Sequence, residues 1–210
     1  MSVEIKLIGV NHFDPFGRDR IAEYLTKEKE VGFIPDCLAV EWDSSIFRRI
    51  YEQRDCLYQK LLMKEYTSNI VEAKMLADSM GFEADSHYSV YNNVPILWLD
   101  EGREASEEEI SAFADDRYEI LLKYRCVRDN SFDMESTRRL LLHKKDFIDY
   151  EPSERDNVFF LKTMKAVDSG KSRIVCIVGQ NHTRIDIEGS FGYQIKEAGF
   201  SFSTIDTTSY

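Results

Sequence analysis

The stretch IVCIVGQNH at residues 174–182 decides how this chain folds. Its first five residues are apolar, which is typical of a strand buried on both faces, and the glycine after them lets the backbone turn sharply. The stretch IKLIGVNH at residues 5–12 repeats this design, with a mostly apolar run followed by Gly-x-Asn-His. Each stretch therefore predicts a core strand whose carboxyl end leads to a histidine, His12 in the first and His182 in the second.

The two histidines are expected to share one site. Ligands of open α/β sheets bind at the carboxyl ends of the strands, so neighbouring strands would bring both imidazoles to one cleft. The chain has four histidines in all, and two of them occupy this repeated context. The alternative is that each histidine follows a strand by chance.

Further strands and helices alternate along the rest of the 210 residues. Strands are predicted at residues 37–41, 94–99 and 202–205, and helices at residues 19–29, 46–61, 68–80, 106–123 and 153–167 and around residue 194. Residues 128–150 also have a helical composition, with poor periodicity. The pattern predicts a single α/β domain over residues 1–210, with a central mixed β-sheet and helices on both faces.

Composition narrows the function classes. The net charge of −11 repels phosphate backbones, which argues against nucleic-acid binding. No apolar stretch is long enough to cross a bilayer, and the first residues lack the pattern of a signal peptide. We therefore expect a cytoplasmic protein with no membrane partner. The sequence is also compatible with a homo-oligomer. The four cysteines have no metal-binding spacing, and Cys37 and Cys176 are expected to pack as small buried hydrophobes.

Carboxylates follow the predicted strands as well. Glu41 ends the second strand, where a buried carboxylate costs several kcal/mol unless it is paired or binds a ligand. Asp100 ends the third strand. Glu83 and His87 are four residues apart and could share one helical face, although His87 also suits a surface or satisfied core position. Imidazole and carboxylate together suit a hydrolytic divalent metal such as Zn, Mn or Co, with one open position for water.

The ordered set of motifs resembles the TraB/PrgY pheromone-shutdown family, whose relatives include the Tiki proteases, the erythromycin esterases and the haem-binding ChaN proteins. The two GxxH motifs stand near the ends of the chain, as in that family. Between them, residues 35–41 are similar to the family's PD-x-V-x-V-E stretch, residues 81–83 to its G-x-E, residues 94–100 to the strand before its Asp-Arg pair, and residues 154–156 to its E-R-D/N helix start.

The chain also departs from the family pattern. Glu101 follows Asp100, so the usual arginine is missing there, and whether Arg103 replaces it stays open. The membrane helices of TraB and the export signal of ChaN are absent. The substrate class therefore cannot be carried over from any one branch.

The resemblance implies a hydrolase, either a metal-dependent peptidase or an esterase, that acts on a peptide or small molecule. Tiki-type members are metal-dependent proteases, whereas erythromycin esterases activate water with His and Glu without an evident metal. On the metal interpretation, His12 and His182 hold the ion, either Glu41 or Glu83 is the third ligand, and the other glutamate is the base. Arg155 would stabilise the developing negative charge.

Several alternatives remain open at this point. Arg155 could instead form a salt bridge, because a cation at a helix start opposes the helix dipole and requires a carboxylate partner. Asn11 and Asn181 are expected to orient their loops rather than to contact substrate. The chain could also be a non-catalytic protein of the ChaN type that binds haem or a metal. A third interpretation is a degenerate member that binds a protein through the acidic helix from Ser106.

Overall fold

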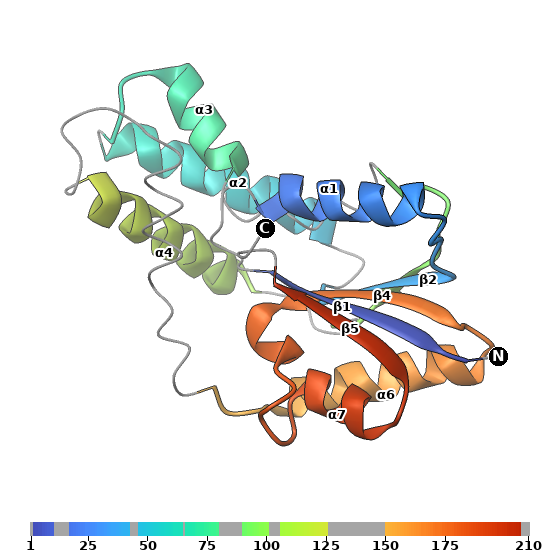
Figure 1. Cartoon of the computed structure of the whole chain (residues 1–210). Coiled ribbons are helices and arrows are strands. Elements are labelled where there is room, and N and C mark those ends of the chain that lie inside the picture. The colour runs from blue at the N-terminus through green and yellow to red at the C-terminus, as the bar shows by residue number, and fades with distance from the viewer. Residues whose placement is uncertain are drawn as a thin grey trace.

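Five parallel strands form the central sheet in a computed structural model of the chain (Figure 1). The structure describes residues 2–10, 17–42, 46–64, 66–79, 90–100, 106–125 and 150–206. The strands are β1 (Glu4–Val10), β2 (Cys37–Val40), β3 (Ile96–Trp98), β4 (Arg173–Gly179) and β5 (Ser201–Asp206), in the order β3-β2-β4-β1-β5. The expected α/β class is confirmed. All described pairings are parallel, however, whereas the sequence predicted a mixed sheet.

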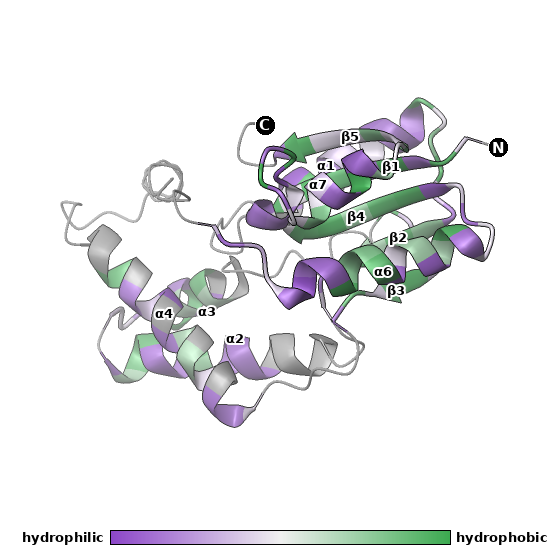
Figure 2. Ribbon diagram, turned by 90° about the horizontal axis from the view of Figure 1, so that it is seen from below, coloured by the Kyte–Doolittle hydropathy of each residue, from purple (hydrophilic) through white to green (hydrophobic). Residues whose placement is uncertain are grey.

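Helices cover both faces of the sheet. Helix α1 (Gly17–Glu30) lies on one face, and α6 (Glu154–Asp168) and α7 (Phe191–Glu197) lie on the other (Figure 1). A short 3₁₀ turn, η2 (Gln180–Thr183), joins β4 to the segment before α7. The remaining helices are α2 (Ile46–Met63), α3 (Ile70–Ser79) and α4 (Glu107–Arg125), and they gather beyond the carboxyl ends of the strands (Figures 1 and 2).

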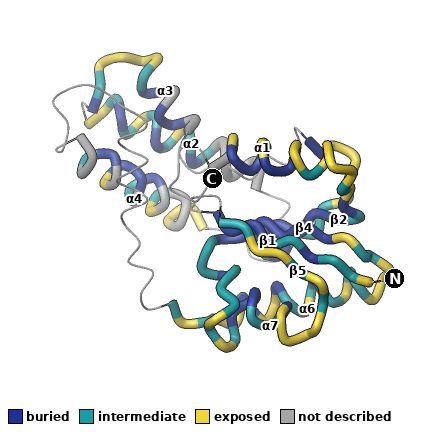
Figure 3. The backbone as a smooth tube through the Cα atoms, in the orientation of Figure 1, coloured by how far each residue is buried: buried dark blue, intermediate teal, exposed yellow. Residues whose placement is uncertain are grey.

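Strand β4 lies at the centre of the sheet and is buried along nearly its whole length (Figure 3). Its side chains alternate between the two faces, as the geometry of a strand requires. Val175 and Ile177 pack in the cluster under α1, and Ile174, Cys176 and Val178 pack in the cluster under α6 and α7. Its apolar run is thus explained by helices on both sides. Burial also raises the pKa of the Cys176 thiol, in keeping with a packing role.

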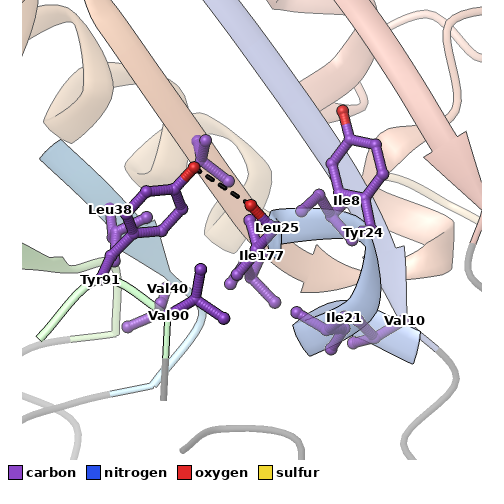
Figure 4. Packing of buried hydrophobic residues seen from close by; sticks show 11 residues of the cluster. Ile8, Val10, Ile21, Tyr24, Leu25, Leu38, Val40, Val90, Tyr91 and Ile177 are labelled. Atoms are coloured by element: carbon purple, nitrogen blue, oxygen red, sulfur yellow. Dashed lines mark hydrogen bonds between the residues drawn. The ribbon is translucent and has the colours of Figure 1, made fainter. Parts of the chain in front are cut away.

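The face under α1 is closed by an aromatic residue that lies outside the described helices and strands. Tyr91 packs among the side chains of this cluster, and its hydroxyl donates to the backbone oxygens of Leu25 at 3.2 Å and Phe33 at 2.9 Å (Figure 4). These bonds fasten the end of α1 to the segment before β3.

Helices α2, α3 and α4 share a hydrophobic cluster of their own. Its members include Leu57, Leu61, Leu76, Tyr118 and Leu121, all of them buried. This cluster holds the acidic helix α4 in the fold, because the apolar side chains on one face of α4 pack against α2. None of the helices in the described ranges combines the length and the apolar character needed to cross a membrane.

The two strands of the GxxH stretches are neighbours, which is the condition that the sequence set for a shared site. In the β1–β4 pairing, Val10 is opposite Gly179. The chain leaves β1 for α1 on one face and β4 for α7 on the other, and both strands end at the carboxyl edge, which is where such sheets bind ligands. Asn11, His12, Glu83, His87 and residues 128–149 lie outside the described residues.

Candidate functional site

Glu41 follows β2 directly and is buried, as expected for a carboxylate that is fully paired. Its backbone N–H donates to the oxygen of Ile177 at 3.0 Å, which extends the β2–β4 ladder by one residue. Carboxylate oxygen Oε2 accepts the backbone N–H of Gly179, and Oε1 lies 2.9 Å from Nη2 of Arg155. The side chain therefore ties the end of β2 to the second GxxH glycine and to α6.

Arg155 joins two carboxylates that come from different strands. Its Nη2 lies 2.9 Å from Glu41 and 2.5 Å from Oδ2 of Asp100, and its Nε lies 3.2 Å from Oδ1 of Asp100. Burial lowers the pKa of the guanidinium, but the two carboxylates outweigh this effect and raise it. The salt bridge considered for Arg155 from the sequence is therefore present. The bridge uses Nε and Nη2, and Nη1 makes no hydrogen bond within the described ranges.

Asp156 accepts hydrogen bonds from several elements at once and is fully buried. Its Oδ2 accepts the Tyr150 hydroxyl at 2.5 Å and the Ser153 backbone N–H at 3.0 Å, and its Oδ1 accepts the backbone N–H of Phe191 at 2.9 Å. The same Oδ1 lies 2.8 Å from Nδ1 of His182. Burial raises the pKa of the carboxyl, but these donors outweigh it and lower the pKa to about 2. Asp156 is therefore a fixed anion between the starts of α6 and α7.

The orientation of His182 follows from this anion. A carboxylate only accepts, so Nδ1 carries a proton and donates it to Asp156. In the neutral form of the ring, the other nitrogen, Nε2, carries the lone pair, and it lies 3.8 Å from Oε1 of Glu41. The ring of Phe159 packs against the imidazole with centroids 5.1 Å apart. His182 is thus buried and held by one nitrogen, with the other turned toward the Glu41–Arg155 pair.

Tyr150 lies on the opposite side of the imidazole from Glu41. Its hydroxyl is 2.9 Å from Nδ1 of His182, and its ring meets the imidazole edge-on at 5.7 Å. Burial and the hydrogen bond to Asp156 raise the pKa of the phenol far above its usual value. The hydroxyl therefore stays protonated and takes part in the polar network around His182.

Gly9, in the first GxxH motif, supports the turn that carries the second histidine. A β-carbon at residue 9 would lie 2.8 Å from Oγ1 of Thr183 and 3.2 Å from Cα of Gln180. The close approach of the 180–183 turn to residue 9 thus explains the glycine of the first GxxH motif. The second, Gly179, has φ −52°, which other residues adopt readily, so the turn into η2 does not require a glycine for its backbone conformation.

The structure brings together part of the residue set that the sequence named. Glu41, Asp100, Arg155 and His182 meet at the carboxyl edge. For Asn181 in η2, the contact that the structure records is its backbone oxygen, which accepts the N–H of Arg184 at 3.3 Å, so its role in orienting the loop stays a prediction.

The sequence did not assign roles to Tyr150, Asp156 and Phe159. A signal for Asp156 exists, because Ser153 and Asp156 form a capping box at the start of α6, which marks a carboxylate at a defined place. Phe159 lies one turn further along the same helix. Tyr150 lies at the end of a segment without periodicity, and no pattern could have indicated it.

A metal site does not form from the described side chains. Within the described ranges, no group of three or more His, Cys, Asp or Glu residues is placed to hold an ion. Both oxygens of Glu41 are already engaged by Arg155 and Gly179, and a guanidinium beside the proposed ligand opposes a cation. His12 lies outside the described residues, so the metal set with His12, His182 and Glu41 stays a prediction.

Comparisons with known proteins give little further guidance. No family model matches the chain, and no curated protein matches it. The chain is similar to the solved structure of the type III effector HopBA1, with 14% sequence identity, coverage of 85% of this chain and 67% of that chain, and a TM-score of 0.33. A likeness this weak carries no argument about function, so the TraB/PrgY resemblance stays an expectation from the motifs.

Proposed function

We propose that the carboxyl edge of the sheet is a hydrolytic site in which His182 is the general base. One observation carries the proposal: Nδ1 of His182 is bound to the buried anion of Asp156, while Nε2 faces the Glu41–Arg155 pair. An imidazole held in this way is prepared to take a proton at Nε2, because the carboxylate stabilises the imidazolium that forms. The proposed substrate is an ester or amide of a small molecule or peptide.

The proposed reaction uses water as the nucleophile. Nε2 of His182 takes a proton from the water, and the oxygen forms a bond to the carbonyl carbon while the π electrons move to the carbonyl oxygen. The two N–H groups on Nη1 of Arg155 would stabilise that oxyanion. When the tetrahedral intermediate collapses, the bond to the leaving alcohol or amine breaks, and the imidazolium returns its proton to the leaving group.

Glu41 supports this chemistry without being the base. Its two oxygens hold Arg155 and the N–H of Gly179, so it fixes the position of the guanidinium. Its Oε1 is also 3.8 Å from Nε2 of His182, near enough to stabilise the imidazolium electrostatically. This assignment replaces the role of metal ligand or base that the sequence suggested for Glu41.

The first GxxH motif belongs to the proposal on the ground of strand pairing. Val10 is opposite Gly179, and His12 follows Val10 by two residues. We therefore include His12 as a second imidazole of the site, with a role in binding substrate or in proton transfer.

Hydrolysis of p-nitrophenyl acetate by the purified full chain tests the proposal. His182→Gln should lower kcat/KM by roughly 100-fold, the lower range for loss of a general base. Arg155→Gln should also lower it, whereas Arg184→Gln, in an exposed pair with Asp186, is the matched control and should retain the wild-type rate. Wild-type rates for His182→Gln would contradict the proposal.

Chelation distinguishes the metal-dependent alternative. The rate of ester hydrolysis should be unchanged after EDTA treatment if water is activated by His182 alone. A rate that is lost on chelation and returns with Zn, Mn or Co would instead support the metal-dependent peptidase or esterase. A Soret band on addition of haem, without turnover of any ester or anilide, would support the non-catalytic binding alternative.

A further inference from the structure

The phenol of Tyr150 and the carboxylate of Asp156 converge on the same nitrogen of His182. Oδ1 of Asp156 lies 2.8 Å from Nδ1, and the Tyr150 oxygen lies 2.9 Å from it. The phenol is itself 2.5 Å from Oδ2 of Asp156. The three groups therefore form a closed triangle of hydrogen-bonding atoms on the side of the imidazole away from Glu41.

Each hydrogen bond in this triangle has one possible direction. The carboxylate of Asp156 has no proton to give, so the phenol O–H must donate to Oδ2. With its proton committed there, the phenol oxygen presents only lone pairs to Nδ1. Two acceptors thus face Nδ1 of His182, and the arrangement is satisfied only when Nδ1 carries the proton.

We infer that Tyr150 is a positioning residue that acts together with Asp156 to fix which nitrogen of His182 is reactive. The inference rests on the proposed function in one respect, which is that Nε2 must be unprotonated to accept a proton from water. Tyr150 acts through His182 and Asp156. It holds the ring by edge-on packing and removes the alternative in which Nε2 carries the proton and Nδ1 the lone pair.

Asp156 alone would fix the proton on Nδ1 of His182 less firmly. Its Oδ1 is shared between Nδ1 of His182 and the backbone N–H of Phe191, which lies at 2.9 Å. Without the phenol oxygen, Nδ1 would keep a single acceptor that it must share, and one edge of the imidazole would lose its packing contact. Phe159 would still limit the tilt of the ring from the other side, at 5.1 Å between centroids, but it carries no group that can tell one nitrogen from the other.

The tautomer of His182 can be measured by nuclear magnetic resonance on the full chain labelled with ¹⁵N-histidine. His182→Gln identifies the relevant signals among the four histidines. In the wild type, Nδ1 should give the signal of a protonated nitrogen and Nε2 that of an unprotonated one. In Tyr150→Phe, the two signals should move toward each other as the second tautomer becomes populated. Tyr91→Phe is the matched control, because it removes a hydroxyl that also makes two hydrogen bonds, and it should leave the His182 signals unchanged.

Kinetics provide a second readout that a merely structural role would not produce. Tyr150→Phe should lower kcat by about 10- to 100-fold, the range expected when a catalytic group is misplaced, with KM within about twofold of the wild type. An unchanged His182 spectrum in a folded Tyr150→Phe would overturn the inference, whatever the wild-type activity. A changed spectrum in a protein that hydrolyses nothing would uphold it and refute the proposed function instead.

The geometry can also be tested without a substitution, should Tyr150→Phe fail to fold. In the wild type, the proton on Nδ1 of His182 should show a nuclear Overhauser effect to the ring protons of Tyr150, because the two rings meet edge-on. Absence of that effect, with the Nδ1 proton visible, would overturn the inference.

Discussion

Nδ1 of His182 lies 2.8 Å from Oδ1 of Asp156, although the two residues are 26 positions apart in the chain. Asp156 is in the first turn of α6, and His182 is in the turn that follows β4. One contact thus joins a helix start on one face of the sheet to the end of the central strand. Both the stability of this edge and the proposed chemistry depend on the same carboxylate.

The stability of the protein should fall in acid because of Asp156. Its hydrogen-bond donors outweigh burial and hold its pKa at about 2 in the folded chain, against 3.8 for an unperturbed group. A lowered pKa stabilises the folded form above about pH 4, and this contribution is lost as the pH falls toward 2, on the order of 2 kcal/mol. Urea unfolding between pH 7 and 2.5 measures it. Asp156→Asn should be less stable at pH 7 and should show a smaller loss in acid, whereas parallel curves for the two proteins would contradict the assignment.

Removal of the imidazole should cost stability as well as activity. His182→Ala takes a donor from a fully buried carboxylate and a ring from the face of Phe159, so the free energy of unfolding should fall by about 1–3 kcal/mol. Thr26→Ala removes an exposed hydroxyl that bonds to the backbone of Ala22, and it should change stability by less than about 0.5 kcal/mol. Equal denaturation midpoints for the two variants would show that Asp156 does not depend on His182.

Arg155 should be more important for stability than its partial exposure suggests. Arg155→Met leaves the buried carboxylates of Glu41 and Asp100 without their shared cation, and because solvent screens the partly exposed guanidinium, the loss should be on the order of 2 kcal/mol, below the range for breaking a fully buried ion pair. A second substitution, Glu41→Gln, removes one of the two unpaired negative charges and should recover part of the lost free energy of unfolding. Chemical denaturation of the two singles and the double gives the coupling. Arg184→Met, in an exposed pair, should cost less than about 1 kcal/mol.

The close approach at Gly9 yields a prediction with a specific rescue. Gly9→Ala would place a β-carbon against Oγ1 of Thr183 and should cost about 1–3 kcal/mol. Thr183→Ala removes that atom, so the double variant should be more stable than the sum of the singles implies.

Gly192→Ala is the control for this rescue, because its β-carbon would lie 2.5 Å from the backbone oxygen of Thr183, which no substitution at residue 183 removes. Thermal unfolding of the five variants measures both effects. A rescue of Gly192→Ala by Thr183→Ala would show that the contact at Gly9 is not the cause.

Much of the fold could be predicted because its signals are local. The apolar runs of β1 and β4 predicted two core strands, and their burial confirms this. Their pairing side by side was a condition of the shared site and not a prediction, and the structure shows that it is met. The expectation that Glu41 would be buried only with a partner is also confirmed. A charge at the end of an apolar strand has few ways to be satisfied, so its environment follows from its position.

The contacts that define the site are not local, and the sequence did not reveal them. Asp156 could be predicted as a helix cap, but its second role, as the partner of His182, depends on how α6 crosses the sheet. Tyr150 approaches from a segment with no periodic pattern. The parallel pairing of β5 with β1 also depends on a crossover that alternating elements alone do not specify.

The arrangement of the sheet sets an order of events during synthesis. Strand β1 is made first, yet its partners on both sides are β4 and β5, which come from residues 173–206. Until those residues leave the ribosome, an apolar strand near the amino terminus has two unpaired edges, and the turn that Gly9 accommodates does not exist. The α2–α4 cluster, whose contacts are closer in sequence, can form earlier. The nascent chain should therefore depend on chaperones that shield β1 until its last strand is complete.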